Sequence, residues 1–332
     1  MNKSILLFVA SSLLLSIFSC KSFQPSANLN NYQKYFESAD TVFDKGKVRI
    51  TFFGTSTLLF DDGETQLLID GFFSRPNAAK AIFGKVKTDT LLLKSILAEQ
   101  NINRLGGIFV CHSHYDHAMD APYVAHITGA TVYGSSSTSF VCSGAGLPQK
   151  QTHVFAAGEK FELGKFTIEV LTSKHTPPFK ILGKSNATDP NHPNITQPLR
   201  QPAKADKFIE GGTFDFYITH GKKRFCVKAS TNYLDSALYR RPTDVFFLGT
   251  AMLGKFTSEF REKYFAETIT ATGAKTVVPI HWDNFTRPLS RPLEALPRIG
   301  DNVDAGFTFL IEKCEQQKIK LQMLQGKQSL VY

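Results

Sequence analysis

Short apolar runs separated by turn-forming residues recur along most of the chain. Between residues 42 and 72, three such runs read as strands, and Asp61-Asp62-Gly63 has the composition of a hairpin turn between the last two. Helices are expected at 91–100, 120–128 and 260–272, and further strands at 107–111, 131–134, 166–171, 211–218, 224–227, 244–248 and 276–280. This mixture of hairpins and βαβ units favours an α/β fold in which helices flank two sheets.

One stretch, residues 176–205, departs from this pattern. It holds six of the fifteen prolines, several asparagines and few apolar runs. Long segments of this kind inside a compact domain are often functional, so the stretch is either a solvated insertion or a lid over a site. His192 lies within it. A lone loop histidine is usually solvated, and a substrate contact is the alternative.

The composition is that of a globular protein with a substantial core. The chain has 332 residues, of which 42% are hydrophobic and 20% charged, enough for one large domain or two ordinary ones. We predict a single domain over residues 43–332 that carries the proline-rich insertion at about 176–205.

The N-terminus has the features of an export signal. After one positive residue, residues 5–18 are apolar but too few for a typical membrane span, and the stretch ends at Cys20 as in a bacterial lipobox. We expect a signal peptide at 1–19, a lipidated Cys20 and a tether over 20–42. The protein would then be a lipoprotein of the bacterial cell envelope, periplasmic or on the outer membrane. Phe18 departs from the small residue usual at its position, so ordinary signal-peptidase cleavage remains the alternative.

Four cysteines follow the export signal, and an exported protein could pair them. They are Cys111, Cys142, Cys226 and Cys314. Cys111 and Cys226 end or lie within apolar strand-like runs. We therefore expect buried thiols that act as small hydrophobic residues rather than a disulfide framework.

The formal net charge of +9 suits an anionic substrate or an anionic membrane surface. Basic surfaces are also common without either. Lys222-Lys223-Arg224 is the only tight basic cluster, and it falls in an expected hairpin turn. No nucleic-acid-binding motif is present, so we expect no nucleic-acid partner.

The strongest chemical signal lies directly after the strand expected at 107–111. His112, His114, Asp116 and His117 place four potential ligands within six residues. Imidazole and carboxylate groups together are the ligands that zinc favours. A polar loop whose histidines cap a helix is the alternative, but three histidines and an aspartate in this order favour a metal site.

This motif resembles the signature of the metallo-β-lactamase superfamily, and further landmarks follow in the order typical of that family. Leu67-Leu68-Ile69-Asp70 resembles the early strand that ends in an aspartate, Thr172-Ser173-Lys174-His175 the third histidine motif, and Val278-Pro279-Ile280-His281-Trp282 the last. The resemblance covers about residues 47–285. It implies a four-layer αββα sandwich.

The resemblance also implies two sets of metal ligands and one partner behind them. His112, His114 and His175 would form the first set, and Asp116, His117 and His281 the second. Asp70 would orient a ligand histidine. One or two Zn²⁺ ions are expected, with Mn²⁺ or Fe as alternatives. A metal lowers the pKa of bound water from about 15.7 to about 7, and Asp116 would orient that water as the catalytic carboxylate.

The sequence departs from the family at one position. Family members usually place a metal-bridging aspartate after the strand expected at 224–227, where this chain has Ser230. A serine hydroxyl is neutral at ordinary pH and bridges poorly. Asp235 could replace the aspartate only if its loop folds back. The second metal position would otherwise be weak, empty or selective for another metal.

Three stretches point to one branch of the superfamily: Gly54-Thr55-Ser56, Ile69-Asp70-Gly71-Phe72-Phe73 and Pro279-Ile280-His281-Trp282-Asp283. They most resemble the branch that includes ascorbate-phosphate lactonases and N-acyl-phosphatidylethanolamine phospholipase D. Phosphodiester hydrolysis, with a phospholipid-derived substrate, is the leading expectation, and hydrolysis of a sugar-derived or acyl lactone is the alternative. A non-catalytic envelope protein that binds metal or ligand is the third hypothesis. Asp283 and Asn284 would contact substrate or serve as an acid, or else cap the turn after His281. The sequence does not determine the oligomeric state.

Overall fold

The computed structural model describes residues 21–36, 46–181, 184–185, 189 and 191–332. The expected signal peptide and the lipidation site Cys20 lie outside the described residues, as does the part of the expected tether after residue 36. No helix within the described part of the chain is long and apolar enough to cross a membrane.

The first sheet has the strand order β16-β1-β2-β3-β4-β5-β6. Its strands are β1 (Arg49–Phe52), β2 (Leu58–Asp61), β3 (Gln66–Ile69), β4 (Leu105–Phe109), β5 (Thr131–Gly134), β6 (Thr152–Val154) and β16 (Ser329–Val331). Pairing is antiparallel from β16 to β3 and parallel from β3 to β6. The expected hairpin at Asp61-Asp62-Gly63 joins β2 to β3.

The second sheet has the order β15-β14-β13-β12-β11-β8-β7. Its strands are β7 (Lys160–Leu163), β8 (Phe166–Thr172), β11 (Phe214–His220), β12 (Lys223–Lys228), β13 (Val245–Gly249), β14 (Thr276–Ile280) and β15 (Lys320–Leu321). A separate short hairpin is formed by β9 (Lys180–Ile181) and β10 (Lys184–Ser185).

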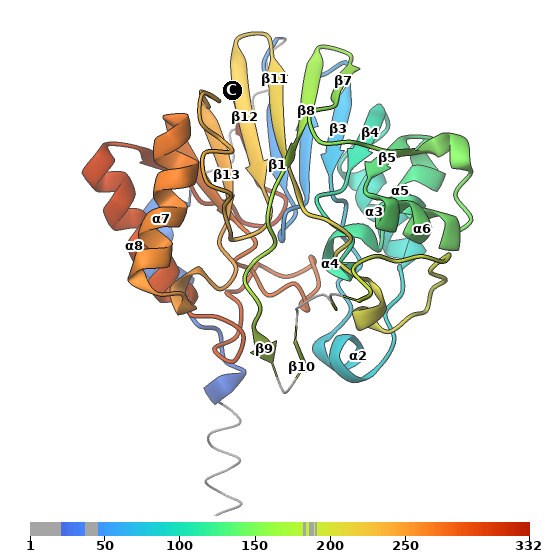
Figure 1. The fold of residues 1–332 in the computed structure, drawn as a ribbon, viewed down its shortest axis with the longest axis horizontal. Coiled ribbons are helices and arrows are strands. Elements are labelled where there is room, and N and C mark those ends of the chain that lie inside the picture. Colours follow the sequence, from blue (N-terminus) through green and yellow to red (C-terminus); the bar gives the residue numbers. More distant parts are fainter. Residues whose placement is uncertain (1–20, 37–45, 182–183, 186–188, 190) are drawn as a thin grey trace, which may run out of the picture.

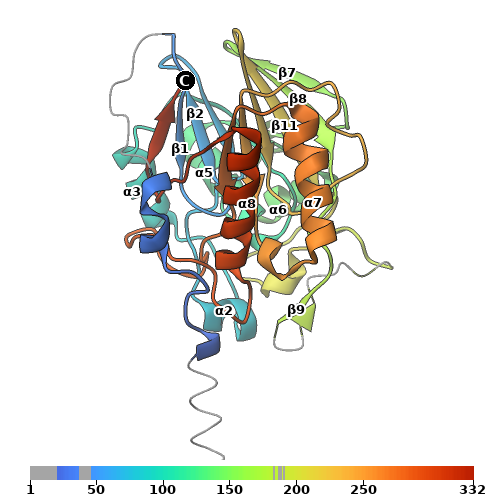
Figure 2. The same cartoon turned by 90° about the vertical axis from the view of Figure 1, so that its left-hand side faces the viewer.

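Helices cover the outer faces of both sheets (Figures 1 and 2). The first sheet is covered by α3 (Thr90–Glu99), α5 (Ala121–Thr128) and α6 (Ser136–Gly144), and the second by α7 (Ser258–Phe265) and α8 (Val303–Gln317). Two short helices, α2 (Ala78–Phe83) and α4 (Tyr115–Ala118), lie toward one end of the sandwich. The expected four-layer αββα architecture is confirmed.

Aromatic side chains hold the two sheets together. Phe60 of the first sheet packs edge-on against Phe225 and Phe247 of the second, with ring centroids 5.6 and 5.9 Å apart. Phe109 and Phe216 make a similar contact at 5.5 Å. Each fully buried aromatic side chain contributes about 1.5–3 kcal/mol through the hydrophobic effect, so these contacts fix how the sheets are stacked.

The first described residues are packed on the domain instead of forming a free tether. The 3₁₀ helix η1 (Leu29–Tyr35) follows the cap Asn28, and the Tyr32 ring is buried against Phe307 of α8 with centroids 5.2 Å apart. The Tyr32 hydroxyl donates to Asp304 at 2.6 Å. Any free tether must therefore be shorter than the expected 20–42.

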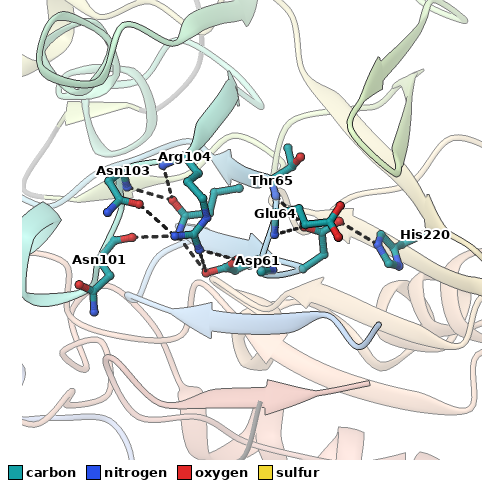
Figure 3. Close-up of polar contacts among 10 residues, drawn as sticks. Asp61, Glu64, Thr65, Asn101, Asn103, Arg104 and His220 are labelled. Atoms are coloured by element: carbon teal, nitrogen blue, oxygen red, sulfur yellow. Dashed lines mark hydrogen bonds and ion pairs between the residues drawn. The ribbon is translucent and has the colours of Figure 1, made fainter. Parts of the chain in front are cut away.

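The end of the sandwich that carries the β2–β3 turn is closed by a polar contact between the sheets (Figure 3). Asp62 accepts hydrogen bonds from the backbone N–H groups of Thr65 (2.6 Å) and Glu64 (2.9 Å) through Oδ1. Its Oδ2 lies 3.1 Å from Nε2 of His220, on β11 of the second sheet. The contact ties the β2–β3 turn to the β11–β12 turn.

Several elements depart from the sequence expectation. The helix expected at 260–272 is α7 followed by a π-helical turn, η5 (Ala266–Thr270). Helices α6 and α8 and the edge strands β15 and β16 were not expected. The four cysteines of the described chain are free and buried, as expected.

Candidate metal centre

Five strands end at the same end of the sandwich and bring the candidate residues together. Asp70 follows β3, His112 follows β4, His175 follows β8, Ser230 follows β12 and His281 follows β14. The loop after β4 leads directly into α4, which carries Asp116 and His117 in its single turn. The expected candidates thus come from both sheets, which explains why they lie far apart in the sequence.

The first candidate set is a compact triad of imidazoles. His112, His114 and His175 each offer one ligand atom, and these atoms lie within 4.8 Å of one another. Their ring centroids are 4.7–4.9 Å apart at steep angles. His112 is buried, whereas His114 and His175 are half-buried, so this triad faces the opening of the site.

The second set lies deeper. Asp116, His117 and His281 also place their ligand atoms within 4.8 Å, and all three are buried. Nε2 of His281 is 3.3 Å from Nε2 of His117 and 3.5 Å from Oδ2 of Asp116. The His112 and His117 rings, 3.9 Å apart, join the two sets into one centre.

Burial keeps most of these histidines neutral. Desolvation and then the neighbouring imidazoles hold the pKa values of His112 and His114 well below the usual value, and burial also lowers the pKa of His175. Burial and the neighbouring His117 lower the pKa of His281 to about 3. Neutral imidazoles expose the lone pair that a metal ligand requires.

His117 differs because two carboxylates face it. Burial lowers its pKa, but the charges of Asp70 and Asp116 outweigh that effect, and the pKa of His117 is raised overall. Asp70 lies 2.8 Å from Nδ1 of His117. It also accepts hydrogen bonds from the hydroxyl of Ser56 and the N–H of Cys111. The contact leaves Nε2 of His117 facing Asp116 and His281.

The donor atoms fit a metal such as zinc. Nδ1 of His112 is buried and has no hydrogen-bond partner within the described residues. A buried polar atom without a partner is unfavourable, and metal coordination is one of the few functions that compensate for it. Five imidazoles and one carboxylate in two compact triads match the ligand preferences of zinc.

His281 is held by a buried network that sequence reasoning missed. Its backbone φ is +59°, and its N–H donates to the carbonyl of Thr55 at 2.6 Å. The Thr55 N–H donates to Asp283, which forms a 2.8 Å ion pair with the fully buried Arg75. Gly54 permits this packing because a Cβ there would lie 1.8 Å from the Arg75 guanidinium. No sequence motif identifies Arg75 as the partner of Asp283.

This network corrects the expectation that Asp283 contacts substrate. Its side chain is fully buried in the ion pair and cannot reach a substrate. Asn284 accepts hydrogen bonds from the N–H and hydroxyl of Thr286, which is the turn-capping alternative. His192 is 78% exposed and pairs with Asp189 in the insertion at 3.1 Å, as expected for a solvated histidine.

Ser230 stands where family members usually have the metal-bridging aspartate. Its side chain is 2% exposed, and its hydroxyl has no hydrogen-bond partner among the described residues. Asn232, two residues on, donates to the carbonyl of His175 at 2.6 Å, which ties this loop to the first triad. Asp235 does not replace the missing aspartate, because it is 71% exposed and pairs with Lys263.

A buried lysine near Ser230 was also missed. Lys228 ends β12 and donates to Ser173 at 2.7 Å and to Asp215 at 2.9 Å. Burial raises the pKa of Asp215 despite the lysine. Because Ser173 lies two residues before His175, the Lys228 contact anchors the loop that presents this histidine.

The proline-rich insertion lies against the site end. Its residues 201–203 pair with the segment after α2, with a β-bridge between Val86 and Ala203 and a 2.7 Å hydrogen bond from the Thr88 N–H to Gln201. Gln201 donates in turn to the carbonyl of Met119, directly after α4. The insertion is therefore fixed to the rim of the site over these residues.

Comparisons with known proteins agree with this architecture. The chain is 33% identical over 113 residues to a "UPF0173 metal-dependent hydrolase" of Heliobacterium modesticaldum, which is 34% of this chain and 39% of that protein. It is 27% identical over 150 residues to a protein of the same description from Myxococcus xanthus, 45% of this chain and 44% of the relative. The chain thus matches less than half the length of these two relatives.

Solved structures show the same fold at low identity. Igni18, a metallo hydrolase of Ignicoccus hospitalis, superimposes with a TM-score of 0.52 at 16% identity, covering 86% of this chain and 98% of that one. An isothiocyanate hydrolase from Delia radicum gut bacteria gives a TM-score of 0.52 at 14% identity, covering 86% and 99%. The sequence profile of the "Metallo-beta-lactamase superfamily" matches residues 50–221, more than half of the chain. The chain belongs to the metallo-β-lactamase superfamily.

Proposed function

We propose that this protein is a metal-dependent hydrolase that cleaves a phosphodiester, with a phospholipid-derived substrate as the first candidate. The observation that carries the proposal is the pair of ligand triads joined at His112 and His117, 3.9 Å apart. Metals bound there would supply an activated water and polarise the scissile group.

The side chains of this protein prepare the centre in three ways. Burial keeps His112, His114 and His281 neutral and ready to bind metal. Asp70 fixes the orientation of His117 through Nδ1. Asp116, with Oδ2 3.5 Å from His281, is the remaining carboxylate of the triads and is placed to orient water or accept its proton.

The choice of a phosphodiester rests on charge and location. The net charge of +9 favours an anionic substrate, and Lys174, next to His175, is exposed at the opening. An envelope lipoprotein anchored at Cys20 would meet phospholipid headgroups. A lactone is the second candidate, because a metal bound at such a centre would polarise a carbonyl oxygen as well as a phosphoryl oxygen.

Metal content tests the centre directly. We expect elemental analysis of protein purified without chelator to give one tightly held zinc per chain and a second that is lost on dialysis, because Ser230 provides no bridging charge. Ser230→Asp restores a carboxylate, so the second metal should resist dialysis in that variant. Less than one metal per chain after zinc is offered back would refute the proposal.

Activity tests the reaction class. Zinc-loaded protein should hydrolyse bis(p-nitrophenyl) phosphate faster than a sugar lactone or an acyl lactone, and Asp116→Asn should lower kcat about 100-fold or more. Asp235→Asn makes the same change on the exposed surface and should leave kcat unchanged. Faster lactone cleavage would replace the phosphodiester proposal with the lactonase. No turnover of either class by the metal-loaded protein would favour the non-catalytic binding protein.

Lipid attachment requires its own test. Protein extracted from the bacterial envelope should carry a diacylglyceryl modification on Cys20, detectable by intact mass, and Cys20→Ser should remove it. A mature mass without lipid would favour ordinary signal-peptidase cleavage.

A further inference from the structure

Three parts of the described chain lie at the end of the molecule that carries the metal centre, and we call their surface the basic end: residues 21–28, residues 76–91, and residues 176–181 with 191–209. The second and third are joined directly, because the Val86 N–H donates to the carbonyl of Ala203 at 2.7 Å and the reverse bond measures 3.1 Å. In both views, α2, β9 and the first described residues lie at the same end of the molecule (Figures 1 and 2).

Most of the net positive charge of the protein falls on the basic end. Its residues include eight lysines and arginines against two aspartates, a net charge of +6 out of +9 for the whole chain. Of these, Lys21, Lys80, Lys85, Lys87, Lys180, Arg200, Lys204 and Lys207 have exposed side chains. A concentration of cations of this size attracts an anionic surface over a Debye length of about 8 Å at physiological salt.

Apolar side chains project from the same end. Phe23 is 51% exposed, Phe83 at the end of α2 is 76% exposed, and Leu91 in the first turn of α3 is 78% exposed. Helix α2 has no buried residue. Lysines that alternate with exposed aromatic and leucine residues are typical of a surface that lies in the interface of a bilayer.

We propose that the basic end docks on an anionic phospholipid bilayer and turns the opening of the metal centre toward the lipid headgroups. The apolar stretch at residues 5–18 and Cys20 directly precede Lys21, where the described chain begins at this end. Each lysine near an anionic membrane strengthens the attraction to it, and the exposed Phe and Leu side chains enter the interface. A nucleic acid would use the cations but leave Phe83 and Leu91 in water. The docking does not depend on catalysis.

Tryptophan fluorescence tests which end of the protein contacts the bilayer. Trp282 is the only tryptophan and is fully buried, so it gives a constant background. Phe83→Trp places a reporter on the basic end, and Lys222→Trp places one on the exposed β11–β12 turn at the opposite end. The full-length protein is mixed with phosphatidylglycerol-containing vesicles made with brominated acyl chains, which quench only tryptophans that reach the bilayer.

We expect strong quenching and a blue shift for the Phe83→Trp reporter and neither for Lys222→Trp. In the Phe83→Trp protein, reversing Lys80, Lys85 and Lys87 to glutamate should weaken vesicle binding at least about tenfold. Reversing Lys165, Lys222 and Lys223, exposed at the opposite end, is the matched control and should change little. Circular dichroism confirms that each variant is folded.

Three results would overturn the proposal. Equal quenching of both reporters would mean that the protein has no preferred face on the membrane. Absence of quenching at both positions would mean that the basic end stays in water. Equal loss of binding in the two charge-reversed proteins would remove the role of the basic end. Because none of these readouts uses turnover, failure here leaves the hydrolase proposal intact, and loss of activity leaves the docking proposal intact.

Discussion

The two ends of the sandwich differ in how completely their buried polar atoms are paired. We call the end with the β2–β3 turn the closed end and the end with the two ligand triads the metal end. At the closed end, Gln66 accepts hydrogen bonds from the N–H groups of Asn103 and Arg104 and donates to the carbonyl of Asn101, all at 3.0 Å (Figure 3). At the metal end, by contrast, a ring atom of His112 and the hydroxyl of Ser230 are buried without partners in the described chain.

Positive backbone φ values occur at both ends: at Asn101 (+52°) at the closed end, and at several residues of the metal end. Asp70, His281 and Thr55 at the metal end have φ values of +58°, +59° and +51°, a region that non-glycine residues rarely adopt. Strained backbone and unpaired donors persist only where the surrounding structure enforces them. The paired polar groups of the closed end stabilise the fold. At the metal end, the unpaired buried atoms and the strained backbone cost stability, and they persist because they hold the ligand atoms in place.

The largest expected effect comes from breaking the buried ion pair between Arg75 and Asp283, which lies behind His281 at the metal end. Arg75→Met leaves Asp283 as an unpaired buried charge, which should lower the free energy of unfolding by about 3–5 kcal/mol. Chemical denaturation of the metal-free protein measures this loss. The double variant Arg75→Met/Asp283→Asn removes the charge as well and should recover part of the stability. A double variant no more stable than Arg75→Met would argue against the unpaired charge as the cause.

A smaller effect should follow when only the orientation of a ligand is disturbed. Asp70→Asn keeps the shape of the side chain but loses the charge beside His117, so zinc affinity should fall about 10- to 100-fold. Competition with a chromophoric chelator measures the affinity. Asp62→Asn, the same substitution at the closed end, is the matched control and should leave zinc binding unchanged. Equal losses in both variants would indicate general destabilisation.

The sequence predicted the metal ligands better than the buried contacts that hold them in place. Ligands such as His112 and His114 are recognisable because metal chemistry restricts both residue type and spacing. Asp283 was expected near substrate because it follows His281, yet only the folded chain reveals that the distant Arg75 neutralises it. Contacts of this kind depend on how two loops meet in space, and no local pattern encodes them.

The same reasoning applies to the fold. The alternating runs of β2 and β3 and their Asp-Gly turn were predicted because the pattern is local. The edge strand β16 pairs with β1 across almost the whole chain, and such pairing leaves no periodic signal in a three-residue strand. Likewise, the π-helical turn after α7 was read as ordinary helix because its residues have a helical pattern.

The smallest expected effect lies at the closed end and depends on pH. Burial would raise the pKa of Asp62, but the N–H groups of Thr65 and Glu64 and the contact with His220 outweigh it, so the pKa is lowered overall. A carboxyl group whose folded pKa is lowered stabilises the fold above its unfolded pKa of about 3.9 and loses that contribution as the pH falls through the folded value.

Asp62→Asn should therefore be less stable than the wild type by about 1 kcal/mol at pH 6, and the difference should shrink below about pH 4. Urea denaturation of both proteins from pH 6 to pH 3 measures the difference. A difference that stays constant over this range would mean that Asp62 acts through the shape of its hydrogen bonds and not through its charge. In that case the two ends would differ in how completely their polar atoms are paired, but not in the use of charge.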